Sequence, residues 1–134
     1  MRARSIVPCI TTDKIDDTKT FYQEHFGAQL EFDCGWYVTL KLGKAKGAPR
    51  VSFMQPEEGM IRFDGQGLMY NFEITAVDKL HDRLKAAGLE IVAPLEDHPW
   101  GDRGFAIRDP SGIVLYWYEA REPDAEFAGY FMES

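Results

Sequence analysis

A strand, a helix and three strands are predicted twice along the chain, and this repeat constrains the fold more than any other feature. Gly27 and Gly88 follow the two predicted helices in equivalent places, 61 residues apart. A glycine at such a position ends a helix in the left-handed conformation. A unit of this length that occurs only twice is not a solenoid repeat. The pattern instead predicts two βαβββ modules in an α+β fold.

The first predicted module spans about residues 4–56. Its first strand covers residues 5–11, and Asp13 is placed to cap the helix that follows. The helix carries apolar side chains at helical spacing and ends at Gly27. Three further strands are predicted from alternating apolar residues over positions 29–33, 36–42 and 50–55.

A linker over residues 57–67 leads to the second predicted module, which spans about residues 68–120. Thr75 is placed to cap its helix. Strands are predicted over positions 68–74, 89–93, 105–107 and 113–118. The tail over residues 121–134 spaces its aromatic residues like one side of a short helix. We expect it to pack on a pocket mouth or on a second subunit.

The last two predicted strands are joined by the sequence Asp109-Pro110-Ser111-Gly112. Asp at the first position, Pro at the second and Gly at the fourth are the residues that a type I turn favours. A β-hairpin is therefore predicted at this point.

Composition restricts the function classes. A chain of 134 residues is long enough for one domain with its own core. Its net charge is −7. Its negative charge disfavours nucleic acid as a partner, and no apolar segment is long enough to span a membrane. We expect no signal peptide, because no long apolar stretch follows the basic N-terminal residues. Cys9 and Cys34 are expected to be free thiols. We expect a soluble, cytoplasmic single domain.

Several motifs together resemble one protein family. Trp100-Gly101 with the segment at 105–112 resembles the closing hairpin of the glyoxalase/bleomycin-resistance/extradiol-dioxygenase superfamily, the vicinal oxygen chelate fold. The helix endings at 20–27 and 84–88 resemble the same family. The resemblance covers about residues 5–120, and the Pro-Trp-Gly lead-in is most similar to the metal-free bleomycin-resistance branch.

This resemblance implies a particular architecture. The two βαβββ modules would lie in a pseudo-two-fold arrangement and form a half-open, barrel-like mixed sheet with the helices on the outside. Relatives form dimers, so a homodimer is expected. The alternative is an unrelated α+β sandwich.

The resemblance also implies where a metal would be bound. Enzymes of the family place divalent-metal ligands at positions that match Val7, Ser52, Met69 and Tyr116. A catalytic divalent site needs about three imidazole or carboxylate ligands. Valine has no lone pair, a thioether is a poor ligand for a hard cation, and neutral hydroxyls are weak. We therefore expect no metal, no cofactor and no catalytic residue of the standard kind.

The three histidines do not replace the missing ligands. His25 and His81 lie in predicted helices, on the side of the sheet away from the cavity, and His98 lies in a predicted loop. Each is interpreted as a surface or internally bonded histidine. Cys9 shares a face with Val7, but a single thiol does not make a metal site.

Alternation along the strands sorts side chains into two faces. One face is bulky and apolar and is expected to pack under the helices: Ile6, Ile10, Val51, Phe53, Tyr70, Phe72, Ile74, Leu115 and Trp117. The other mixes polar and aromatic groups, as a small-molecule pocket requires. With two rim tryptophans it gives the candidate ligand-binding residues: Trp36, Arg50, Ser52, Met54, Met69, Asn71, Glu73, Trp100, Tyr116 and Tyr118.

Two roles are left open among these residues. Trp100 matches the tryptophan that stacks on the ligand in bleomycin-binding relatives, or it only pins a loop to the rim. Glu73 and Arg50 either orient a ligand or form an ion pair across the sheet. Met54 and Met69 suit an adaptable wall, although methionine in a strand is also an ordinary core residue.

Three functions follow from these observations. The first is a binding protein of the sequestration or sensing type, which holds a small aromatic or amphipathic molecule without a catalytic metal. The second is an enzyme of the same fold, a lyase, isomerase, dioxygenase or thiol transferase with a non-standard site. The third is an interaction module whose tail docks a partner. Antibiotic resistance is a label of the branch and does not follow from the residues.

Overall fold

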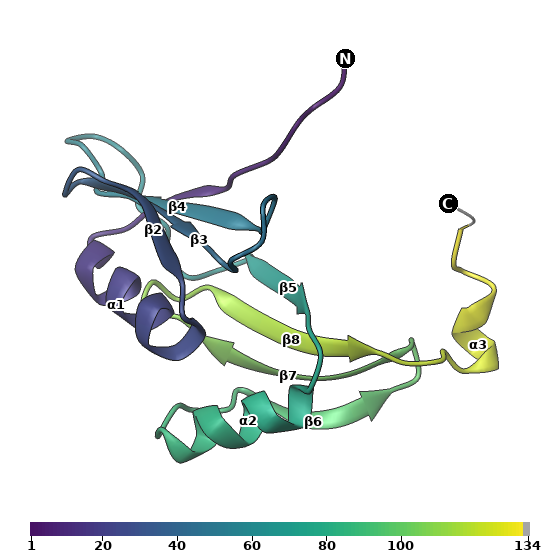
Figure 1. Ribbon diagram of the computed structural model, residues 1–134. Helices are drawn as coiled ribbons and strands as arrows, with labels where there is room; N and C mark the ends of the chain where they lie inside the picture. The colour runs from purple at the N-terminus through teal and green to yellow at the C-terminus, as the bar shows by residue number, and fades with distance from the viewer. Residues whose placement is uncertain (133–134) are drawn as a thin grey trace. The chain divides into compact units, whose positions relative to one another are not determined.

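The computed structural model describes residues 1–132, and their contacts divide the chain into two compact units (Figure 1). The first unit comprises Met1–Gln66 together with Asp109–Gly112. The second unit comprises Gly67–Arg108 and the chain from Ile113 onward. The boundary after Gln66 falls at the end of the predicted linker. Each unit is described separately below.

The first unit contains a four-stranded mixed sheet. Its elements are β1 (Cys9–Thr11), α1 (Ile15–Phe26), β2 (Gln29–Asp33), β3 (Tyr37–Lys41) and β4 (Arg50–Met54). The strand order is β1-β4-β3-β2, with β1 parallel to β4 and the other neighbours antiparallel. Val38, Leu40, Val51 and Phe53 are buried on one face, and the ring of Tyr22 from α1 packs 5.7 Å from that of Phe53. The core therefore lies between α1 and this face.

The second unit repeats the same plan. Its elements are β5 (Met69–Glu73), α2 (Val77–Ala86), β6 (Ala93–His98), β7 (Asp102–Arg108), β8 (Val114–Ala120) and a short α3 (Ala125–Ala128). The strand order is β5-β8-β7-β6, again with one parallel pair, β5 with β8. The predicted α+β fold of two βαβββ modules is confirmed.

Strand pairing fixes the equivalence of the two modules. Cys9 pairs with Ser52 in the first unit, and Asn71 pairs with Tyr116 in the second. The equivalent partners are 62 and 64 residues apart, which are the offsets expected from the sequence repeat. The two glycines predicted to follow the helices both have positive φ, 61° at Gly27 and 87° at Gly88. This agrees with the left-handed conformation expected there.

The first strand is shorter than predicted. Residues 5–8 lie outside β1, and Ile6, expected in the apolar core, is 86% exposed. Pro8 explains the difference, since proline has no N–H to donate to a sheet ladder. Only its carbonyl takes part, accepting a hydrogen bond of 2.8 Å from the Ser52 amide.

Neither helix is capped by the predicted residue. Helix α1 begins at Ile15, without a side-chain cap from Asp13, and the Thr12 hydroxyl instead accepts a hydrogen bond from the Lys14 amide. Helix α2 begins at Val77 and not after a Thr75 cap; the carboxylate of Glu119 accepts a hydrogen bond from the Val77 amide. A residue on β8 thus satisfies one of the free amides at the start of α2.

The prediction of a strand over residues 89–93 is wrong, because residues 89–92 lie outside every strand. Leu89 donates its amide to the carbonyl of Leu84 and so closes the end of α2 instead of starting a ladder. The strand in this place is β6, Ala93–His98. His98, predicted in a loop, is its last residue.

The turn Asp109-Pro110-Ser111-Gly112 forms as predicted and belongs with the first unit. The Gly112 amide bonds to the Asp109 carbonyl at 3.0 Å, and the Ser111 amide bonds to Asp109 Oδ1 at 2.9 Å. Tyr22 donates its hydroxyl hydrogen bond to Asp109 Oδ2 at 2.7 Å, with both side chains buried. The Ser111 hydroxyl lies 2.7 Å from that of Thr18.

The core of the second unit lies between its sheet and α2. Phe105, Ile107 and Leu115 are fully buried together with Val77 and Leu84 from the helix. None of the helices in the described part of the chain has the length and apolar character needed to span a bilayer.

Candidate functional site

A pocket of about 460 Å³ lies in the second unit. Its walls are largely aromatic, with one amide, one carboxylate and one thioether among them. The lining residues are Met69, Asn71, Trp100, Gly101, Asp102, Tyr116, Tyr118 and Phe131. A cavity of this size and character is typical of small-molecule sites.

Strands β5 and β8 place four of these side chains on one face. Met69 and Asn71 are two residues apart on β5, as are Tyr116 and Tyr118 on β8, and Asn71 lies opposite Tyr116 in the parallel ladder. The rings of Tyr116 and Tyr118 are 5.8 Å apart and nearly parallel. Glu119, the next residue on β8, faces the other way and caps α2. The alternation predicted for this strand is therefore correct.

Gly104 makes room for the ring of Tyr116. A Cβ at this position would lie 2.6 Å from Tyr116 Cζ and 2.8 Å from the carbonyl oxygen of Trp117. Since real Cβ atoms do not approach other heavy atoms so closely, only glycine fits between the two strands here. The absence of a side chain at Gly104 thus allows Tyr116 to lie across β7 and reach Asp102.

Asp102 organises the polar side of the pocket. Its side chain is 10% exposed, and three donors converge on the carboxylate. Oδ1 accepts from the Tyr116 hydroxyl at 2.8 Å and from His98 Nδ1 at 2.7 Å. Oδ2 accepts from Trp100 Nε1 at 2.9 Å. The tautomer of His98 that carries its proton on Nδ1 donates the hydrogen bond to Oδ1. These contacts stabilise the buried charge and fix all four side chains.

Besides its hydrogen bond to Asp102, Trp100 is held at the pocket rim by two ring contacts. Its indole stacks on the His98 ring at 4.3 Å with an interplanar angle of 4°, and Phe127 of α3 meets it edge-on at 6.5 Å. The side chain nevertheless remains 46% exposed. Trp100 is therefore pinned in place and still offers aromatic surface to the pocket.

The pKa of Tyr116 is raised above its ordinary value. Burial is the main cause, followed by the hydrogen bond to Asp102 and the charge of that carboxylate. The phenol thus stays protonated at neutral pH and donates a hydrogen bond to Asp102.

The structure brings together five of the ten candidate ligand-binding residues, Met69, Asn71, Trp100, Tyr116 and Tyr118. Glu73 is exposed on the same strand as Met69 and Asn71. The other four lie in the first unit: Trp36, Arg50, Ser52 and Met54.

Two of these first-unit residues have local partners. Ser52 is only 1% exposed and its hydroxyl lies 2.8 Å from that of Thr39. Arg50 forms an ion pair with Glu31 within its own unit.

Sequence reasoning missed Gly101, Asp102 and Phe131 as lining residues. Asp102 follows Trp100 by two positions, a spacing that allows a short-range side-chain bond, but its burial depends on the folded hairpin. Phe131 belongs to the aromatic tail, one of whose predicted packing partners was a pocket mouth. Its place in the lining agrees with that alternative.

The comparison with known families decides the assignment of the fold. The model of the Glyoxalase/Bleomycin resistance protein/Dioxygenase superfamily matches residues 5–116. The chain belongs to this superfamily. A search of the curated proteins gives no match.

Solved structures of other proteins share this fold at low sequence identity. A glyoxalase/bleomycin resistance protein/dioxygenase from Nocardioides is 19% identical with a TM-score of 0.72, covering 91% of this chain and 87% of that one. Lactoylglutathione lyase from Agrobacterium tumefaciens is 20% identical with a TM-score of 0.67, covering 89% and 96%. TioX from Micromonospora sp. ML1 is 22% identical with a TM-score of 0.70, covering 88% and 99%.

The four positions that the family resemblance implies as metal ligands carry side chains that suit a divalent cation poorly. The Tyr116 hydroxyl donates a hydrogen bond to Asp102, while the Ser52 hydroxyl is engaged with Thr39. Val7 has no donor atom, and the Met69 thioether is a poor ligand for a hard cation. Within residues 1–132, no three His, Cys, Asp or Glu side chains are grouped so that they could hold a metal. The donor set therefore does not fit the metal of the superfamily's enzymes.

Proposed function

We propose that this protein binds a small aromatic or amphipathic molecule in the pocket of the second unit, without a catalytic metal. The observation that carries the proposal is the combination of aromatic walls with a fixed polar cluster. Trp100, Tyr116, Tyr118 and Phe131 provide apolar area for stacking. Asp102 and Asn71 provide the few polar groups that orient a ligand.

The pocket is organised before a ligand arrives. Asp102 holds Tyr116 and Trp100 through hydrogen bonds of 2.8 and 2.9 Å, so these rings lose little freedom on binding. Such preorganisation raises affinity because it lowers the entropic cost of association. A role in sequestration or sensing needs this affinity and no chemical step.

A thermal-shift screen with aromatic antibiotics, glutathione conjugates and divalent metals tests the proposal. A molecule that binds only the folded protein raises its Tm. The hit is then titrated against the wild type and against Trp100→Ala, which we expect to weaken binding about tenfold through the loss of stacking area. Trp36→Ala is the matched control, since Trp36 lies outside this pocket and should leave the affinity unchanged.

Two results would contradict this function. One is equal weakening by both tryptophan variants, which would mean that the pocket of the second unit is not the binding site. The other is a stoichiometric metal that survives dialysis and supports turnover.

An enzyme with a non-standard site is the second candidate. The observation that favours it is the 2.7 Å contact between Asp102 and His98 Nδ1 beside the pocket, because a carboxylate that orients an imidazole is a common arrangement for proton transfer. Incubation of the identified ligand with the protein, followed by mass spectrometry, distinguishes the two. Conversion that is lost in His98→Gln would favour the enzyme.

The homodimer expected from the superfamily is likewise a proposal. The exposed apolar side chains of Tyr130, Phe131 and Met132 in the tail are compatible with it. Size-exclusion chromatography with light scattering tests it, and a monomeric mass at micromolar concentration would contradict it.

A further inference from the structure

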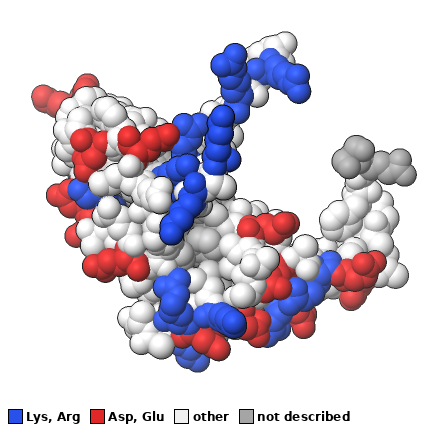
Figure 2. Space-filling view, viewed as in Figure 1, with Lys and Arg blue, Asp and Glu red and all other residues white. Residues whose placement is uncertain are grey.

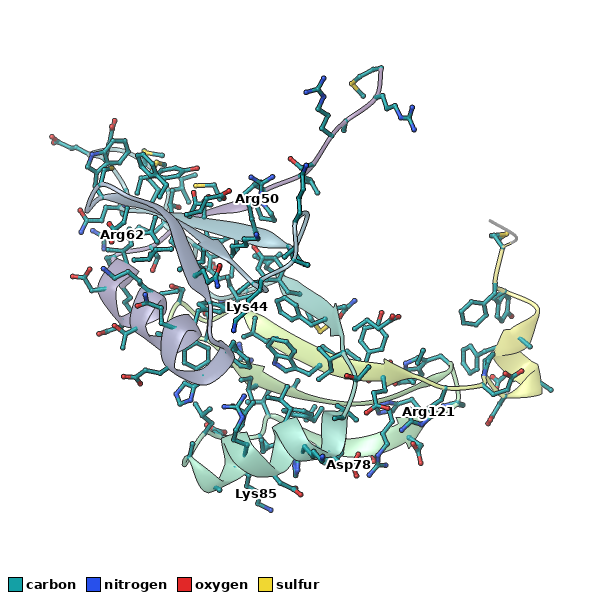
Figure 3. All side chains as sticks on the ribbon, in the orientation of Figure 1. Lys44, Arg50, Arg62, Asp78, Lys85 and Arg121 are labelled. Carbon is teal, nitrogen blue, oxygen red and sulfur yellow. The ribbon has the colours of Figure 1, made fainter. Side chains whose placement is uncertain are left out.

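A second hollow, in the first unit, has five cations among its eleven lining residues. It has a volume of about 690 Å³ and lies among the N-terminal residues 4–6, the paired strands β3 and β4 and the loop that joins them. Figure 2 shows the Lys and Arg side chains gathered on this face, and Figure 3 labels Lys44 and Arg50 there. The basic hollow, as we call it, contains Arg4, Lys41, Lys44, Lys46 and Arg50 but only one acid, Glu31.

This concentration of positive charge contrasts with the rest of the chain. The protein has 22 acidic and 15 basic residues, and one third of the basic residues line this single hollow. Several cations elsewhere have close carboxylate partners, as Lys19 has in Asp33 at 3.1 Å and Arg103 in Asp78 at 2.9 Å. Chance placement in an acidic protein would favour such pairing.

Most of the charge in the basic hollow is not compensated internally. Arg50 forms one ion pair with Glu31, at a distance of 3.4 Å. For Arg4, Lys41, Lys44 and Lys46, no ion pair is formed with any acid among residues 1–132. The hollow therefore has a net positive charge that an anion would neutralise.

The backbone holds these cations near one another. Lys41 and Arg50 lie directly opposite in the antiparallel ladder of β3 and β4, where like charges destabilise a sheet. The loop between them is closed by a 2.7 Å hydrogen bond from the Leu42 amide to the Pro49 carbonyl. A bound anion would offset the repulsion that this arrangement creates.

The loop itself leaves space for a ligand. Lys44 and Lys46 alternate with glycine and alanine over residues 43–48, so no bulky side chain competes with them for the hollow. Ala48, Pro49 and Ile6 add apolar surface to the lining. The volume falls in the range of roughly 300–1,000 Å³ that suits small organic ligands.

We propose that the basic hollow binds a small polyanion, a phosphorylated molecule of metabolite size with at least two negative charges. Arginine matches phosphate oxygens with its planar fork, and lysine binds them as a point charge. A single exposed ion pair adds little affinity, so several simultaneous contacts are required and a monoanion binds poorly. This site is distinct from the pocket of the second unit and does not depend on the function proposed there.

Titration calorimetry with inorganic pyrophosphate at low ionic strength tests the proposal, with acetate as the monoanion. We expect saturable binding of pyrophosphate and none of acetate. The double variant Lys44→Gln/Lys46→Gln should weaken pyrophosphate binding about tenfold. The control Lys79→Gln/Lys85→Gln removes the same charge from exposed positions of α2 and should change the affinity less than about twofold.

A third variant guards against a structural effect in the loop. Arg4→Gln alters a residue that lies outside every strand and helix, and it should weaken pyrophosphate binding about threefold without lowering Tm. The proposal is overturned by a wild type that shows no saturable pyrophosphate binding, by acetate binding of equal strength, or by equal weakening in the α2 control.

Discussion

The hydroxyl of Tyr116 donates a hydrogen bond of 2.8 Å to Oδ1 of Asp102, across two neighbouring strands of the second unit. The same carboxylate oxygen accepts from His98 at 2.7 Å. A residue at one of the positions that the family resemblance implies as metal ligands is thereby engaged in an internal network. This contact holds the Tyr116 ring in a fixed position in the aromatic pocket.

Tyr116→Phe tests the protonation of this phenol. The pKa of Tyr116 is raised in the folded state, so its stabilising contribution is present below the ordinary pKa of about 10 and is lost as pH rises through the folded-state value. We therefore expect the difference in unfolding free energy between wild type and variant to shrink above about pH 10.

Absorbance at the phenolate band provides an independent check of the same variant. The number of tyrosines that ionise near pH 10 in the folded protein should be equal in wild type and Tyr116→Phe. One fewer ionising group in the variant would mean that Tyr116 titrates normally.

Gly104→Ala should displace the Tyr116 ring in the pocket and destabilise the fold. The added Cβ would collide with the Tyr116 ring at 2.6 Å and with the Trp117 carbonyl oxygen at 2.8 Å, and the backbone atom cannot rotate away. We expect a loss of about 1–3 kcal/mol in urea unfolding, as is typical of overpacking. The control is Gly129→Ala, where no atom lies within 4 Å of the new Cβ. Equal stability of the two variants would be incompatible with the packing described.

Glu119→Gln should change the way in which Tm depends on pH below about pH 6. The pKa of Glu119 is lowered, first by the hydrogen bond from the Val77 amide and then by the one from Arg121. Its contribution is present above the ordinary value of about 4.3 and is lost as pH falls through the folded-state pKa. The Tm difference between wild type and variant should narrow from pH 6 towards about pH 3.

Glu122→Gln serves as the control for this measurement, since it removes a nearby exposed acid that forms no ion pair within residues 1–132. Its Tm difference from wild type should stay constant over the same pH range. A Glu119→Gln difference that is also constant would show that the carboxylate does not contribute through its charge.

Tyr22→Phe should destabilise the first unit. The hydroxyl of Tyr22 donates to a buried carboxylate, Asp109, at 2.7 Å, and hydrogen bonds to charged groups contribute about 1.5–3 kcal/mol. We expect a loss of this size in urea unfolding. Tyr130→Phe removes a hydroxyl from an exposed side chain and should be neutral. A neutral Tyr22→Phe would refute the contribution of the bond to Asp109.

Local patterns predicted the parts of the structure that depend on local physics. Alternation along β8 assigned Tyr116 and Tyr118 to one face and Glu119 to the other, because a strand turns its side chains by half a turn per residue. The turn at Asp109–Gly112 and the glycine after α1 also depend on a few adjacent residues. These features needed no information about distant parts of the chain.

Features that depend on distant partners were not predicted. The cap of α2 comes from Glu119, 42 residues beyond the helix start, and no local pattern at Thr75 reports it. No local pattern distinguishes Asp102 from an ordinary polar residue, because Tyr116 lies beside it only in the folded hairpin of β7 and β8. The sequence pattern thus located the face of the pocket, but it did not identify the carboxylate that orders it.

The placement of the turn at Asp109–Gly112 within the first unit has a consequence for biosynthesis. Tyr22 and Thr18 form side-chain hydrogen bonds with Asp109 and Ser111, which leave the ribosome about ninety residues later. A nascent chain that ends before this turn keeps those hydroxyls without these partners. The amino-terminal half should therefore complete its folding only after most of the carboxyl-terminal half has been translated, so that a gene truncated at the linker yields an unstable product.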